Sequence, residues 1–135
     1  MAYDPAALPP GATELLAERH LAVLAVVRPD GGLHQAPVGV TWDPDAGLAR
    51  VITWAGAHKV DLVRRAGRAS VCHVDGARWL SLEGTAAVVD DPGRVAEAVR
   101  RYADRYRQPS ARPDRVAIEI RVERVLGSRS LVAPR

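Results

Sequence analysis

Hydrophobic and polar residues alternate along most of this chain with the two-residue period of β-strands. The alternation is clearest near the C-terminus, where Val116, Ile118, Ile120 and Val122 share one face. Similar patterns and short apolar runs predict strands at residues 21–28, 34–42, 48–54, 69–74, 78–89 and 116–123. The regular secondary structure is therefore expected to be mainly sheet.

Turn sequences separate these strands and decide how they pair. Residues 29–32 (Pro-Asp-Gly-Gly), 43–47 and 75–76 (Asp-Gly) are typical of tight turns. Consecutive strands joined by tight turns favour antiparallel pairing. Pro37 cannot donate a backbone hydrogen bond, so we expect its strand to lie at a sheet edge or a bulge.

Helical periodicity is limited to three segments. A short helix is predicted over residues 13–19 with Thr13 as its cap, and another over 59–66 that ends near Gly67. The longest helix starts at the capping pair Asp91-Pro92. Its apolar stripe consists of Val95, Val99, Tyr102 and Tyr106.

These elements predict a mainly β fold with minor α content. We expect a small, closed or partly closed antiparallel barrel with one long and two short helices. Residues 1–10, rich in proline and alanine, are expected to form a flexible N-terminal arm. Residues 11–135 are expected to form a single domain, because no repeat or linker divides them.

Charge and composition narrow the class of ligand. The net charge is +3 and the sequence pI about 9.6, but aromatic residues make up only 4% of the chain. Few platforms for base stacking are then available, so we expect an anionic small molecule rather than nucleic acid. We also expect no signal peptide, no membrane segment and a cytoplasmic location, because the longest apolar run is short and Cys72 is the only cysteine.

Several kinds of catalytic site find little support in the sequence. The four histidines show no metal-ligand spacing, and Cys72 lies in an apolar strand, where we expect it to be buried. There is no nucleophile elbow and no classical dinucleotide fingerprint. Glu83 and Glu119 are the one candidate acid/base pair, although solvated or cross-strand ionic roles are commoner for carboxylates in strands.

Lys59 is the only lysine among nineteen basic residues. It follows a predicted strand and a turn of small residues and stands in the first turn of the short helix at 59–66. The N–H groups and the positive dipole end of such a helix attract phosphate. An ordinary surface lysine is the competing interpretation.

Two tryptophans lie beside cations at strand ends. Trp54 precedes Lys59, and Trp79 follows Arg78. An aromatic ring next to a cation suits a flat, anionic heteroaromatic ligand. Core or interface packing is an equally good explanation for either tryptophan alone.

Five segments of the chain are similar to a known family of oxidoreductases. They are residues 18–22 (ERHLA), 49–53 (ARVIT), 74–84 (VDGARWLSLEG), 101–107 (RYADRYR) and 123–128 (ERVLGS). Together with the Thr53…Lys59 corner they resemble the flavin/deazaflavin oxidoreductases of the split β-barrel fold, which include pyridoxamine phosphate oxidase. Within that family the chain looks closest to the actinobacterial, F420-dependent biliverdin reductases.

The resemblance implies a six- to seven-stranded antiparallel split β-barrel of the FMN-binding type. It also implies a homodimer with a cofactor at the subunit interface, and a lysine, here Lys59, that binds the cofactor phosphate. The implied cofactor-binding residues are Lys59, His58, Thr53, Trp54, Gln35, Ala36, Pro37, Val38, Arg78 and Trp79. Family members often carry an extra arginine just before this lysine; its absence here leaves Arg64 or Arg65 as candidates to compensate.

The implied activity is hydride transfer from reduced coenzyme F420 to a conjugated acceptor, most directly biliverdin to bilirubin. No catalytic side chain is then required, because the hydride comes from the cofactor. Charge suggests Arg28 and Arg78 as partners of an anionic substrate. An FMN enzyme of the same fold and a non-catalytic flavin or F420 carrier remain alternatives. No metal, nucleic acid or membrane is implied.

Overall fold

The computed structural model describes all residues, 1–135. In chain order the strands are β1 (Ala2–Tyr3), β2 (Ala22–Val27), β3 (Leu33–Val38), β4 (Thr41–Asp43), β5 (Leu48–Trp54), β6 (Arg68–Asp75), β7 (Arg78–Val89) and β8 (Arg115–Gly127). The helices are α1 (Pro10–Ala17), α2 (His58–Ala66) and α3 (Pro92–Arg105), with a 3-10 turn η1 at Arg129–Val132. No helix is both long and apolar enough to cross a membrane.

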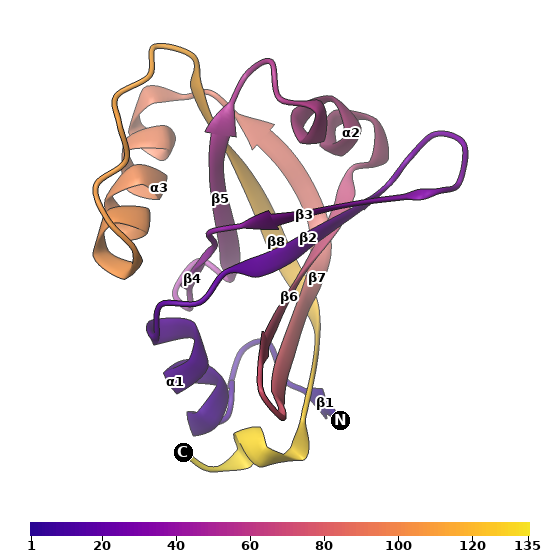
Figure 1. Ribbon diagram of the computed structural model, residues 1–135, viewed down its shortest axis with the longest axis vertical. Helices are drawn as coiled ribbons and strands as arrows, with labels where there is room; N and C mark the ends of the chain where they lie inside the picture. The colour runs from indigo at the N-terminus through magenta and orange to yellow at the C-terminus, as the bar shows by residue number, and fades with distance from the viewer.

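The strands form one antiparallel sheet of eight strands in the order β3-β2-β6-β7-β8-β5-β4, with β1 paired to β8. The sheet curls strongly, so that β3 and β2 cross in front of β5, β7 and β8 (Figure 1). β3 and β4, the two ends of the order, are neighbours in the chain and are separated only by Gly39 and Val40. The split-barrel prediction is confirmed, and the barrel is split where β3 gives way to β4.

The strand count exceeds the six to seven expected because of two short strands. The predicted strand at 34–42 is interrupted at Gly39, which gives β3 and β4. A side chain at Gly39 would meet Tyr102 Cε2 at 2.7 Å. Pro37 lies in β3, which pairs with β2 alone, so the edge position predicted for this proline is confirmed.

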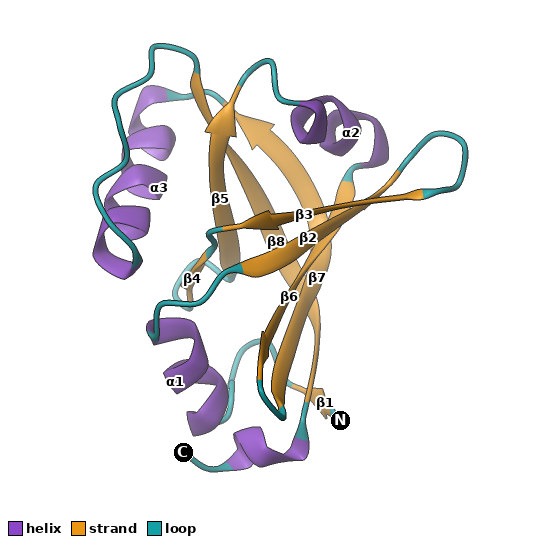
Figure 2. Cartoon of the chain, in the orientation of Figure 1, coloured by secondary structure: helices purple, strands orange, loops and turns teal.

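The N-terminal residues are bound to the sheet instead of loose. Ala2 and Tyr3 pair with Leu126 and Val125, and the Tyr3 hydroxyl donates to the Ser128 carbonyl at 2.7 Å. α1 begins earlier than predicted, at Pro10, and Thr13 does not cap it. The first ten residues thus cover one end of the sheet together with α1 and η1 (Figure 2).

The largest core cluster lies inside the curled sheet, where the inward residues of β2, β6, β7 and β8 meet α1 and α2. α3 packs outside the barrel with Ala98 fully buried, and its predicted apolar stripe is turned away from solvent: Val95, Val99 and Tyr102 are half-buried and Tyr106 is buried. Ion pairs add to this packing: Arg94 binds Glu119 of β8, and Arg101 Nη2 lies 3.2 Å from Asp43 Oδ2 of β4. Glu119 is ion-paired with Arg94, the role that is commoner for carboxylates in strands, so the structure gives no support to Glu83 and Glu119 as an acid/base pair.

Candidate functional site

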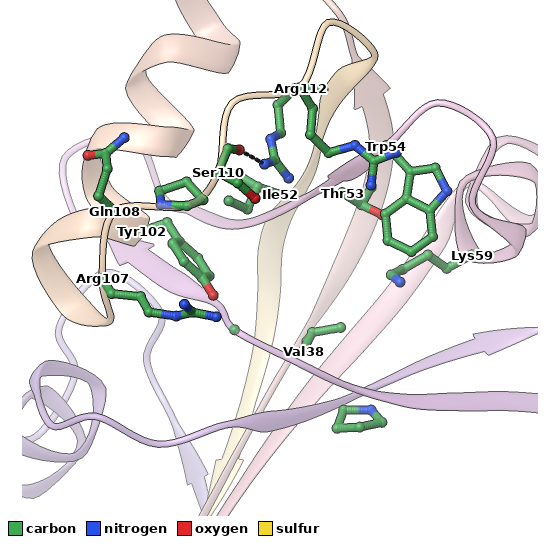
Figure 3. A pocket seen from close by; sticks show the side chains of 14 residues that line it. Val38, Ile52, Thr53, Trp54, Lys59, Tyr102, Arg107, Gln108, Ser110 and Arg112 are labelled. Atoms are coloured by element: carbon green, nitrogen blue, oxygen red, sulfur yellow. Dashed lines mark hydrogen bonds between the residues drawn. The ribbon is translucent and has the colours of Figure 1, made fainter.

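A cleft of about 540 Å³ opens where the barrel is split. Its walls come from the end of β3, the end of β5, the first turn of α2, the C-terminal part of α3 and the loop that leads to β8 (Figure 3). The volume falls in the range of small-molecule and cofactor sites. The residues that line it are Pro37, Val38, Gly39, Ile52, Thr53, Trp54, Lys59, Tyr102, Arg107, Gln108, Pro109, Ser110, Arg112 and Arg115.

Lys59 lies in the first turn of α2, as predicted, and its half-buried ammonium lies 5.0 Å from the ring centroid of Trp54. Burial lowers the pKa of Lys59, and no carboxylate offsets this effect. The residue before the helix, Ala57, has no side-chain cap to offer. The ammonium and the first N–H groups of α2 are therefore available to an anion.

Trp54 forms the centre of one wall. Two cations approach its ring, with Lys59 Nζ at 5.0 Å and Arg112 Cζ at 4.9 Å from the ring centroid. Both distances are within the range of cation–π attraction. The ring remains 39% exposed, so a ligand can still reach it.

Thr53 supplies the clearest sign of a missing partner. Its side chain is 2% exposed, and its Oγ1 has no hydrogen-bond partner although the residue lines the cleft. Buried hydroxyls are almost always hydrogen-bonded. A ligand oxygen in the cleft is a natural partner for this group.

The charges in the cleft are all of one sign. Lys59, Arg107, Arg112 and Arg115 line it, and no aspartate or glutamate does. Asp114 pairs with Arg112 at 3.0 Å, and the Arg115 guanidinium donates to the Ser110 carbonyl at 2.7 Å. The arrangement favours an anionic ligand, as the composition predicted.

Five residues expected at the cofactor by resemblance gather here: Thr53, Trp54, Lys59, Pro37 and Val38. Gln35 and Ala36 precede them in β3 but do not line the cleft. His58 is exposed and stacks edge-on against His34 at a centroid distance of 5.2 Å. The histidine therefore packs toward β3, outside the cleft.

Arg78 and Arg28 lie elsewhere. Arg78, the first residue of β7, is 8% exposed and binds Glu18 at 2.8 Å, Glu14 and Asp75. The turn between β6 and β7 lies near α1 and away from α2 (Figure 1). Arg28 is exposed in the turn between β2 and β3 and pairs with Asp30 at 3.3 Å. The structure brings neither arginine into this cleft, so their predicted contacts with a ligand have no support within one chain.

The wall formed by Tyr102 and the loop 107–115 was not predicted from the sequence. The signal was present, because three arginines and two prolines lie within residues 107–115. These residues are far from Lys59 along the chain, so local sequence patterns do not connect the two segments. In the structure the Ala55 N–H donates to the Asp114 carbonyl at 2.9 Å and joins them.

Cys72 also differs from expectation, since it is only half-buried, and burial raises its pKa.

Comparisons with known proteins agree with this architecture. The family model described as pyridoxamine 5'-phosphate oxidase matches residues 8–129. The chain is 51% identical over 121 residues to an F420H(2)-dependent biliverdin reductase of Mycobacterium tuberculosis, covering 90% of this chain and 88% of that protein.

Solved structures share the fold. A conserved hypothetical protein of Mycobacterium tuberculosis superposes with a TM-score of 0.75 at 23% identity, over 92% of this chain and 87% of that one. An F420 reductase superposes with a TM-score of 0.69 at 25% identity, over 84% of this chain and 94% of that one. By its matched length, its identity to the mycobacterial reductase and its split barrel, the chain belongs to the pyridoxamine 5'-phosphate oxidase family.

Proposed function

We propose that this protein is an F420H2-dependent reductase whose acceptor is biliverdin. The observation that carries the proposal is the Lys59 corner, where a free ammonium, an uncapped helix start and an unpartnered Thr53 hydroxyl meet in a cleft. The 51% identical relative bears this activity in its name. The charges of the cleft support an anionic cofactor, and the name of the relative supports F420 as that cofactor.

The residues of the cleft fit the phosphate of a deazaflavin. Lys59 and the first N–H groups of α2 would bind the phosphate oxygens, and Thr53 Oγ1 would gain the hydrogen bond it lacks. Pro37 and Val38 would lie along the ring. Lys59 then anchors the cofactor, and its loss would weaken binding more than it would change the chemical step.

A bound reduced deazaflavin supplies the hydride. The protein must exclude water, fix one face of the ring and hold the acceptor in place, and none of these tasks needs a nucleophile. Arg107 and Arg115 are better placed than Arg28 or Arg78 to bind the acceptor's propionates, because they line the cleft. The proton that completes the reduction would come from solvent or a nearby donor.

A homodimer is part of the same proposal. The outer face of β2, β6 and β7 carries a band of exposed apolar side chains, namely Leu21, Val23, Val74 and Trp79, with exposures of 37–66%. Val74 and Trp79 are cross-strand partners. An apolar band of this kind favours a partner surface, and a second copy would cover it symmetrically. We also propose a cytoplasmic location, which the single free cysteine supports.

Two titrations test the cofactor assignment. Oxidised F420 and FMN are each added to the purified protein, and binding is followed by the absorbance and fluorescence of the cofactor. We expect tighter binding of F420. Tighter binding of FMN would favour an FMN enzyme of the same family instead.

A turnover experiment separates an enzyme from a carrier. Biliverdin is added to the protein loaded with F420H2, and the oxidation of the cofactor is recorded together with the formation of bilirubin. We expect one bilirubin per F420H2 oxidised. Binding of F420 without oxidation on adding biliverdin would indicate a carrier or a different acceptor.

A further inference from the structure

Arg112 approaches the same indole as Lys59, but from another part of the chain. Its guanidinium carbon lies 4.9 Å from the Trp54 ring centroid, and Lys59 Nζ lies 5.0 Å from it. Figure 3 shows the two cations reaching Trp54 from different walls of the cleft. The buried, unpartnered hydroxyl of the adjacent Thr53 lines the same cleft.

The position of Arg112 is fixed by Asp114. The Asp114 carboxylate accepts from Arg112 Nε at 3.0 Å and from Nη2 at 3.3 Å, which leaves Nη1 free of any protein partner. The Asp114 carbonyl accepts from the Ala55 N–H at 2.9 Å, in the turn that leads to α2. One residue therefore orients the guanidinium and ties its loop to the Lys59 corner.

The arginines near Lys59 in sequence are placed differently. Arg64 and Arg65 are exposed, and Arg65 Nε pairs with Asp61 at 3.1 Å. Neither lines the cleft. Arg115 lines it but donates to the Ser110 carbonyl and makes no cation–π contact with Trp54. Arg112 is the arginine that the fold brings to Lys59.

We infer that Arg112 is a phosphate-binding residue and forms, with Lys59, a two-cation clamp on one anionic group of the cofactor. It takes the place that sequence reasoning gave to Arg64 or Arg65. The inference rests on the proposed function for the identity of the cofactor. The clamp itself requires only a phosphate.

The test compares ligands with and without phosphate. Native protein and the Arg112→Gln variant are titrated at low salt with F420 and with the same deazaflavin lacking its phosphate and tail. We expect Arg112→Gln to weaken F420 binding roughly tenfold to a hundredfold, the range for a charge-assisted hydrogen bond. Binding of the phosphate-free deazaflavin should change less than twofold.

Matched variants control for charge and folding. Arg64→Gln and Arg65→Gln remove the same charge from exposed positions and should leave the F420 affinity within twofold of native. Arg112→Lys retains the charge and should recover part of the lost affinity. A melting temperature close to native shows that Arg112→Gln is folded.

The outcomes separate this inference from the proposed function. An unchanged F420 affinity in Arg112→Gln, or an equal loss for both ligands, overturns the clamp. If native protein prefers FMN, the proposed function fails. The clamp is then tested by the effect of Arg112→Gln on the affinities for FMN and for riboflavin, which differ by one phosphate. Binding of no cofactor at all overturns both.

Discussion

At the scale of single residues, the half-buried ammonium of Lys59 is the group on which the proposed cofactor site depends most. All the remaining lysine-or-arginine positions of the chain are occupied by arginine. Burial lowers the pKa of Lys59, so the group is less firmly charged than a surface lysine. An anion beside it would restore the charge, which couples ligand binding to the protonation of Lys59.

This coupling predicts an alkaline loss of affinity. Phosphate attracts the ammonium and not the neutral amine, so binding is strongest below the lowered pKa of Lys59 and weakens as pH rises through it. Lys59→Ala should bind F420 about tenfold to a hundredfold more weakly at neutral pH. Affinities measured by fluorescence titration from pH 7 to 10 check both statements.

The control is Lys59→Arg. Arginine stays charged over this pH range. A loss of F420 affinity at high pH that comes from titration of the ligand itself persists in Lys59→Arg. A loss of affinity that comes from titration of Lys59 disappears in this variant. An identical alkaline decline in native protein and Lys59→Arg would contradict the assignment.

At the scale of elements, the register between β7 and β8 changes at Gly84. Glu83 pairs with Arg124 and Gly84 with Val122, so Glu123 is the extra residue of a β-bulge. A Cβ on Gly84 would lie 1.7 Å from the Arg121 carbonyl oxygen. Two backbones meet there, and only glycine leaves enough space.

Gly84→Ala should therefore be strongly destabilising. Because the obstructing atom belongs to the backbone, the pair β7–β8 must separate locally, and we expect a loss of about 2–3 kcal/mol or more in the free energy of unfolding. Urea denaturation measures it. Gly56→Ala is the control, since the nearest atom there is 3.9 Å away, and its stability should stay within about 0.5 kcal/mol of native.

These elements also show what the sequence could predict. Alternation placed β5, β7 and the inward residues of β8 correctly, and Gly67 ends α2 in a left-handed conformation (φ 67°) as expected. The break at Gly39 was missed because the ring that excludes a side chain there, that of Tyr102, lies in α3. Local periodicity carries no information about such a contact.

The candidate site shows the same limit. Lys59, Thr53 and Trp54 are close in sequence and were predicted together, whereas Arg112 joins them only through the link between Ala55 and Asp114. Arg78 was expected at the site because of the family resemblance and its charge. In the structure its charge is compensated by Glu14, Glu18 and Asp75, and the bonds to Asp75 and Glu18 raise its pKa.

At the scale of the whole molecule, the apolar band on β2, β6 and β7 predicts self-association. Val74→Asp places a charge in that band and should convert a dimer, at twice 14.5 kDa, to a single chain. Light scattering after size exclusion measures the mass. Cofactor affinity should fall as well if the interface completes the cleft.

The matched control is Val132→Asp. Val132 is 54% exposed but lies outside the band, near the C-terminus. This variant should keep the native mass. If native protein already runs as one chain, or if both variants dissociate equally, the band is not the dimer surface.

The central position of β8 has a consequence for biosynthesis. β8 comes last in chain order among the eight described strands, yet it lies between β5 and β7 and pairs with β1 as well. Until it emerges from the ribosome, β5 and β7 present unpaired edges, and Arg112 and Asp114 have no fixed place beside Lys59. The cofactor therefore cannot stabilise the nascent chain while these strand edges are unpaired and prone to aggregation. Cofactor loading must follow completion of the fold, so a shortage of cofactor should leave a folded apoprotein rather than a misfolded one.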